Sequence, residues 1–206
     1  MGSSCAKVVS HLGGLPSRLY EKCVLNATHL ISSKCNSFQE TIIWYNHCML
    51  HYSNRYFFSQ VQKSPSFHML NAIVVSSTTP EQKFFTFTLS KMLANLVKET
   101  KDSDERYLIK SSKLNFLQTL YALSQCTQDL FSDDCKSFVE DIIGNIPWSL
   151  LGSMRERVLY PSCNIKFELF QFFWVPDKPQ RPTSNDPSPA SHNSKCYNSI
   201  FFSNVF

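Results

Sequence analysis

The chain has 206 residues, of which 43% are hydrophobic and 17% charged, and its 20 Lys+Arg against 16 Asp+Glu give a net charge of +4. This composition is sufficient for folded cores and excludes a largely disordered chain. The basic residues are scattered along the sequence, so charge gives no support for binding to nucleic acid or to an acidic membrane. Apolar runs long enough for a transmembrane helix, about 18 residues, are absent from the sequence.

Eight cysteines favour a disulfide framework that forms in an oxidising compartment. The first sixteen residues, MGSSCAKVVSHLGGLP, contain no basic start followed by an apolar run, so no signal peptide is visible in this chain. The cysteine content and the N-terminal sequence therefore point to different compartments.

Helix and strand signals define the elements in chain order. Thr79 and Gln82 form a capping box with Pro80 at the first helical position, and Ser132 is positioned to cap a later helix that Gly144 can close. Period-two alternation predicts a strand after Cys48 and another after Cys163. In order, we expect a helix after residue 16, a linker at 59–64, a helix at 80–98, strands at 106–110 and 114–123, and a helix at 132–144.

A weak internal repeat relates the two halves of the chain at a constant offset of 115 residues, which carries Cys48 onto Cys163. IIWYNHCMLHYSNRYFF (42–58) aligns with RVLYPSCNIKFELFQFF (157–173), and apolar residues alternate after each cysteine. We therefore predict two copies of one small domain, each ending in strands with one buried face. The first copy is expected to lack the opening helix and the strands that follow it.

The residues around the third helix resemble a known family. CTQDLFSDDCKSF (126–138) resembles the C-x8-C-x2-C motif of the plant ginkbilobin-homologous domain, with Phe138 where the third cysteine belongs. YALSQC before it and both aligned segments resemble the same family. It includes secreted cysteine-rich repeat proteins, the paired ectodomains of cysteine-rich receptor-like kinases and plasmodesmata-located proteins.

The resemblance implies an α+β fold, an antiparallel sheet with two helices packed on one face, in tandem with the first copy incomplete. The expected domains are a partial copy at 12–58, a near-complete copy at 64–174 and a Pro/Ser-rich flexible tail at 175–206. The tail contains five of the ten prolines and few apolar residues before its end.

The family's disulfide pairing, carried over by position, implies two bridges: Cys126 with Cys135, and Cys23 with Cys48. Because Phe138 removes its usual partner, Cys163 is most simply expected as a buried strand thiol. The pairing of the remaining cysteines stays open: Cys5, Cys35, Cys163 and Cys196.

Some family members bind mannose through an Asn, an Arg and a Glu. Arg157 and Glu168 match the Arg and the Glu in the second copy, but no residue matches the Asn. In the first copy these positions hold Ile42 and Ser53, so no such site is expected there. Glu168 stands near Lys166, and a solvated ion pair is the simpler interpretation of that carboxylate.

A metal site at His47, Cys48 and His51, with Cys23 and Cys35, is a weaker possibility. On a strand His47 points away from Cys48, and the chain has no C-x2-C pair. We therefore predict no metal and no other cofactor. The sequence also shows no phosphate-binding glycine loop and no catalytic constellation, so no enzyme activity is predicted.

By resemblance, the chain is expected to be an extracellular (apoplastic) recognition or interaction module in plant stress or defence. Its expected partners are a cell-wall or fungal carbohydrate or another ectodomain, without nucleic acid. Asn26 begins a glycosylation sequon that is usable only in the secretory pathway. Two alternatives stay open: an intracellular thiol-containing or metal-binding α+β protein, and a non-functional truncated receptor fragment.

Overall fold

The computed structural model describes residues 5–10, 17–34, 39–70, 79–100, 102–146 and 155–173. The chain forms two compact units: the second is Phe58–Phe172, and the first contains the described residues up to Phe57. Among the described residues, the helices lack the length and apolar character that a bilayer crossing requires. The predicted tail at 175–206 lies outside the described residues.

The first unit is a three-stranded antiparallel sheet with one helix. Its elements are β1 (Cys5–Ser10), α1 (Ser17–Lys34), β2 (Glu40–Trp44) and β3 (Cys48–Ser53), and the strand order is β1-β3-β2. Cys48, Leu50 and Tyr52 alternate along β3 on the side of α1, as the period-two pattern predicts. All six residues of β3 are buried, so the expectation of a single buried face is not met. The small core that results consists of Ala27, Ile31, Ile43, Leu50 and Tyr52.

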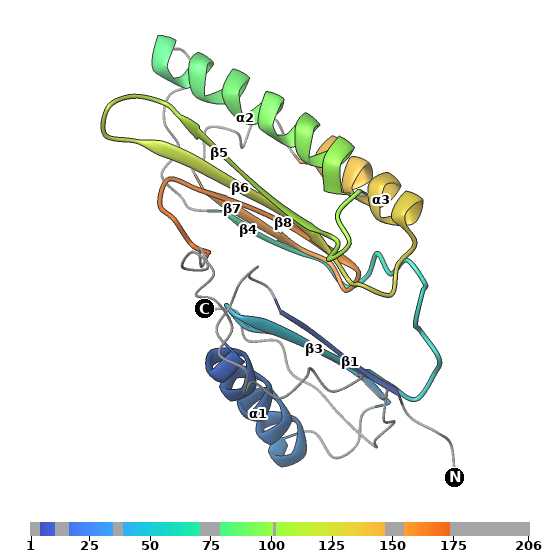
Figure 1. The fold of residues 1–206 in the computed structure, drawn as a ribbon. Coiled ribbons are helices and arrows are strands. Elements are labelled where there is room, and N and C mark those ends of the chain that lie inside the picture. The colour runs from blue at the N-terminus through green and yellow to red at the C-terminus, as the bar shows by residue number, and fades with distance from the viewer. Residues whose placement is uncertain are drawn as a thin grey trace, which may run out of the picture. The chain divides into compact units, whose positions relative to one another are not determined.

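The second unit is a five-stranded antiparallel sheet whose strand order is β4-β7-β8-β6-β5. Its helices α2 and α3 both lie on one face of this sheet (Figure 1). The predicted fold class, α+β with an antiparallel sheet and two helices on one face, is therefore confirmed. The elements are β4 (Phe67–Leu70), α2 (Pro80–Thr100), β5 (Tyr107–Lys113), β6 (Thr119–Cys126), α3 (Ser132–Gly144), β7 (Glu156–Leu159) and β8 (Cys163–Glu168).

The core of the second unit lies between the two helices and the sheet. Leu89 and Leu93 of α2 and Val139 of α3 are almost fully buried against Val158 and Ile165 of the central strands. Burial of each such side chain contributes about 1.5–3 kcal/mol relative to exposure. This core also fixes the positions of three cysteines, which lie at one end of it.

The internal repeat is present in both topology and packing. The order β1-β3-β2 corresponds to β6-β8-β7 at the offset of 115 residues. The five core residues of the first unit, moved by the same offset, fall on five core residues of the second: Ile142, Ile146, Val158, Ile165 and Phe167. The domain bounds 12–58 and 64–174 stay predictions, but the two units share one β-α-β-β plan.

One strand of that plan was not predicted. No strand was predicted before the helix of the first copy, yet β1 pairs antiparallel with β3, with Val8 opposite Leu50. The pairing satisfies one edge of β3, whose backbone groups need hydrogen-bond partners. Among the described residues, the first unit therefore lacks equivalents of α2 and β5, but it contains the equivalent of β6.

Two local boundaries also differ from the prediction. The strand expected at 114–123 starts at Thr119, because the Asn115 side chain accepts hydrogen bonds from the backbone N–H groups of Leu117 and Gln118 and closes a turn. Helix α3 has Phe131, not Ser132, at its N-cap and shows no side-chain capping bond. The Thr79 cap of α2 is confirmed, since the Gln82 N–H donates to its hydroxyl at 3.2 Å.

Candidate functional site

In the first unit a disulfide holds the helix on the sheet. Cys23 of α1 and Cys48 of β3, with Cα atoms 6.1 Å apart, are joined through their sulfurs. This is the pair that the family pairing implies. With its sulfur bonded, Cys48 is no metal ligand beside His51, whose Nε2 instead lies 3.2 Å from Glu40 Oε1 while its ring stacks on Phe57 at 4.0 Å.

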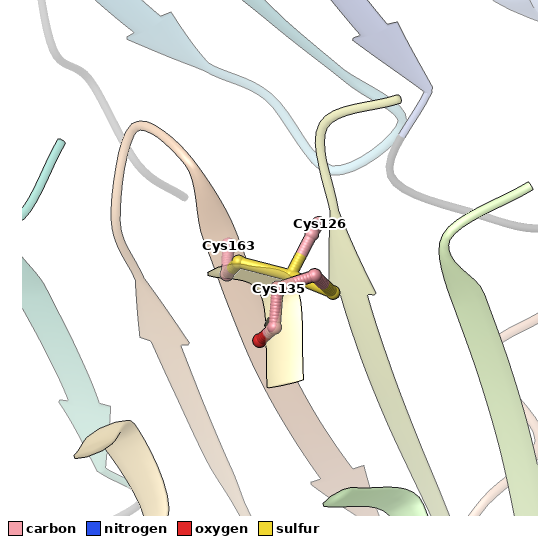
Figure 2. A group of neighbouring side chains, drawn as sticks. All are labelled: Cys126, Cys135 and Cys163. Atoms are coloured by element: carbon pink, nitrogen blue, oxygen red, sulfur yellow. Dashed lines mark hydrogen bonds between the residues drawn. A yellow bond between two sulfur atoms is a disulfide. The ribbon is translucent and has the colours of Figure 1, made fainter. Parts of the chain in front are cut away.

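In the second unit three cysteines gather at one point (Figure 2). Cys126 ends β6, Cys135 lies in α3 and Cys163 begins β8, and their Sγ atoms all lie within 4.8 Å of one another. The three residues are each at most 2% exposed. We call these residues the cysteine triad.

Within the triad Cys126 is close to both other residues. Its Cα lies 6.0 Å from that of Cys135 and 4.0 Å from that of Cys163, and its sulfur is placed in bonding range of both. Cys163 is a buried strand residue, as expected, but it lies close to two other sulfurs, and its pairing stays open. The reason for this closeness is the strand register, because antiparallel pairing of β6 with β8 puts Cys126 directly opposite Cys163.

Phe138 occupies the position that Cys23 holds in the first unit. It is 3% exposed, and its ring meets the edge of Tyr160 with centroids 5.2 Å apart. Lys63 Nζ lies 5.3 Å from the same ring, a favourable cation–π distance. An aromatic ring thus fills the space where the first unit has a helix-to-strand disulfide.

Arg157 and Glu168 lie on the sheet face opposite α2 and α3. Arg157 of β7 is paired with Lys166 of β8, and Glu168 is two residues further along β8, so the two side chains share a face. The Glu168 carboxylate lies 3.5 Å from Arg155 Nε and 3.7 Å from Lys166 Nζ. The structure therefore brings the predicted pair onto one face and also gives Glu168 two cationic neighbours.

Burial shifts the pKa values of the ionisable side chains on this face. It lowers the pKa of Arg157 to about 10, because the charged guanidinium loses hydration. Burial also raises the pKa of Glu168, while the charges of Lys166 and Arg155 oppose that rise. The guanidinium of Arg157 is a hydrogen-bond donor, and the carboxylate of Glu168 is an acceptor. A ligand that offers hydroxyl groups could therefore hydrogen-bond to both.

Glu156 is a buried carboxylate that sequence reasoning did not single out. It is paired with Phe167 and therefore faces the helices, with 2% exposure. Its Oε1 lies 3.7 Å from His68 Nδ1, and burial raises its pKa to about 7. The available signal was its position two residues before Val158, on the same side of the strand.

The sequon residue Asn26 lies exposed on α1, and the Thr28 hydroxyl donates to the Val24 carbonyl at 2.8 Å. Glycosylation at Asn26 stays a prediction.

These observations describe a cysteine-containing α+β domain with a helix-capped antiparallel sheet. Residues 74–169 match the Stress-antifung family model, described as Salt stress response/antifungal. This stretch is therefore similar to the domain that the family model describes. The resemblance to ginkbilobin-homologous proteins is confirmed.

Curated relatives agree with this assignment. The chain is 32% identical over 150 residues to an antimicrobial ginkbilobin-2-like protein of Castanea crenata, which covers 73% of this chain and 61% of that protein. It is 30% identical to cysteine-rich repeat secretory protein 38 of Arabidopsis thaliana, over 73% and 58% of the two chains. It is 27% identical to cysteine-rich receptor-like protein kinase 25 of A. thaliana, over 78% of this chain and 24% of that protein. The chain thus spans less than two thirds of the length of these relatives.

Solved structures show the same fold. The tandem DUF26 ectodomain of the A. thaliana cysteine-rich receptor-like protein PDLP5 has a TM-score of 0.62 at 15% identity, covering 81% of this chain and 74% of that one. The corresponding ectodomain of PDLP8 has a TM-score of 0.60 at 16% identity, covering 81% of each chain.

Proposed function

We propose that this chain is a non-enzymatic recognition module that acts outside the cell in a plant stress or defence response. The family match over 74–169 carries the proposal, because the matched relatives are named as secretory, antimicrobial and receptor-like proteins. The disulfide between Cys23 and Cys48 supports it, since such bridges persist in oxidising compartments.

The compartment is tested by the thiol count of protein isolated from its native tissue. The protein is alkylated before and after reduction, and the mass difference counts the cysteines that were bridged. We expect at least four bridged cysteines, including Cys23 and Cys48. Eight free thiols would contradict the extracellular proposal and favour the intracellular alternative.

We further propose that the face with Arg157 and Glu168 contacts a mannose-type sugar of the cell wall or of a fungus. The guanidinium can donate to sugar hydroxyl oxygens, and the carboxylate can accept from sugar hydroxyl groups. Binding must compete with the contacts of Glu168 to Arg155 and Lys166. We therefore expect weak affinity and a dependence on both residues.

Retention on immobilised mannan tests this site. Arg157→Ala and Glu168→Ala should each weaken retention severalfold, and circular dichroism checks that the variants fold. Glu99→Ala is the matched control, because Glu99 also carries a carboxylate paired with a lysine, Lys110 at 2.5 Å, but lies on α2. Retention that neither site variant changes would eliminate the sugar site and leave another ectodomain as the expected partner.

A further inference from the structure

We propose that the cysteine triad is a disulfide-exchange site, in which Cys126 bonds alternately to Cys135 and to Cys163. One thiol always stays inside the core of the second unit. The proposal concerns this unit alone and does not depend on the identity of any ligand.

Cys126 has two possible disulfide partners close to it. A disulfide sulfur bonds to one other sulfur, yet Cys126 lies near two. Its Cα separation from Cys135, 6.0 Å, falls in the usual range of about 4.4–6.8 Å for bridged pairs, and its separation from Cys163, 4.0 Å, lies just below that range. The two partners approach from different elements, Cys135 from α3 and Cys163 from β8. Three buried sulfurs within 4.8 Å therefore support one bridge and leave one thiol over.

The triad has three cysteines and not an even number because Phe138 stands where the first unit has a helix cysteine. In the first unit the strand cysteine Cys48 is bonded to Cys23 of the helix. The equivalent of Cys48 is Cys163, but the equivalent helix position holds Phe138. Cys163 thus keeps its place on the central strand without a helix partner, and the strand register presents it to Cys126.

The exchange step is balanced without an added oxidant. The Cys163 thiol loses its proton, and its thiolate attacks Sγ of Cys126 in the Cys126–Cys135 bridge. The Cys126–Cys163 bond forms as the Cys126–Cys135 bond breaks, and the electron pair leaves on Cys135 Sγ, which takes up the proton. The number of disulfides is unchanged. The attacking species is the thiolate, so exchange should quicken as the pH rises.

The two linkages differ in what they fasten. The bridge from Cys126 to Cys135 ties the end of β6 to α3, whereas the bridge from Cys126 to Cys163 ties β6 to the neighbouring strand β8. In the second form α3 is held on the sheet by packing alone. The site therefore selects whether this helix is covalently attached.

Disulfide mapping of the full chain, secreted from a eukaryotic host, tests the proposal. Acid protonates the thiolates and so stops exchange, denaturant exposes the buried thiols, and a maleimide then labels the free thiols before digestion with trypsin. Trypsin leaves Cys126 and Cys135 in one peptide, 114–136, and Cys163 in another, 158–166. The first linkage gives a closed 114–136 peptide with labelled Cys163, and the second joins the two peptides with labelled Cys135.

We expect both linkages, each above about one tenth of the total, because the two partners compete for the same sulfur. In the same digest the Cys23–Cys48 linkage serves as an internal control for scrambling and should appear as a single form. Either triad linkage below that fraction would overturn the proposal, and so would three free or metal-bound thiols in the triad.

Phe138→Cys sharpens the test by giving Cys163 the partner that Cys48 has. We expect the new thiol to bond to Cys163 and the Cys126–Cys163 linkage to fall at least about tenfold, leaving Cys126 bonded to Cys135. The control is Phe131→Cys, which adds a thiol at an exposed position just before the same helix. An unchanged ratio of linkages in Phe138→Cys, or an equal change in the control, would contradict the exchange site.

Discussion

The two units hold a helix against the central strand of their sheet in different ways. In the first, α1 is fastened to the central strand by the Cys23–Cys48 disulfide. In the second, the same helix position holds Phe138, which packs against Tyr160, and the strand cysteine faces a different pair of sulfurs. In both units a bulky contact fills this position, and only in the first is that contact a covalent bond.

Core size explains which unit keeps the bond. Among the described residues, the core cluster of the first unit has five buried members and that of the second has nineteen, since α2 adds a second helix. Small cores bury too little apolar area to offset chain entropy and commonly depend on disulfides. The first unit therefore depends on its bridge more than the second depends on a covalent equivalent.

The largest effect is expected from the residue that replaces the bridge. Phe138→Ala should lower the free energy of unfolding by about 3–5 kcal/mol, because it leaves a cavity between α3 and the sheet. Urea unfolding measures the change. Phe131→Ala, at a 68% exposed position beside the same helix, should be nearly neutral. Equal losses in the two variants would contradict the packing role of Phe138.

The disulfide of the first unit should have a slightly smaller effect. Replacing both Cys23 and Cys48 by alanine opens a loop of 25 residues, which predicts a loss of about 3.5 kcal/mol. Hydrogen exchange with mass spectrometry locates the loss. Faster exchange should appear first in α1 and β3. Unchanged exchange there would show that the first unit does not depend on its bridge.

Buried Glu156 gives the second unit a pH dependence. Its pKa is raised to about 7 in the folded state, so the protonated form is favoured by folding. This contribution is fully present below about pH 4.5 and is lost as the pH rises to about 7, which costs about 3 kcal/mol. Glu156→Gln should therefore abolish this loss and be the more stable protein at pH 8. A parallel pH dependence in the variant, followed by thermal unfolding, would contradict this assignment.

The smallest effect concerns α2, for which the described part of the first unit has no equivalent. Thr79→Ala removes the hydroxyl that accepts the Gln82 N–H and should cost about 1 kcal/mol. Ser132→Ala is the matched control, because α3 shows no side-chain cap and the change should be nearly neutral. A larger loss in Ser132→Ala than in Thr79→Ala would reverse this prediction.

The sequence could predict what depends on local pattern. Alternation after Cys48 and Cys163 identified the central strands, and the Thr79 cap identified the start of α2, because both signals act over a few residues. The partner of Cys163 could not be predicted, since it depends on which residue of another strand lies opposite. β1 was missed for the same reason, as its pairing with β3 joins residues 38 to 48 positions apart.

The sequence could predict some residues of the candidate site but not all of their contacts. Resemblance identified Arg157 and Glu168, and the sequence already placed Lys166 near Glu168. Arg155 was missed, because it lies just before β7 and reaches Glu168 only through the pairing of β7 with β8. Glu156 was missed because its one signal, a position two residues before Val158, does not by itself show that a charged side chain is buried.

The central claim is that one β-α-β-β plan is built twice in this chain. Cross-strand NOEs between backbone protons in an NMR spectrum test it most directly, because they report strand pairing itself. We predict that each central strand shows NOEs to both neighbours, and their absence between β1 and β3 would contradict a repeated plan. The diagnostic contacts are Leu50 with Val8 and with Ile43, and Ile165 with Ser124 and with Val158.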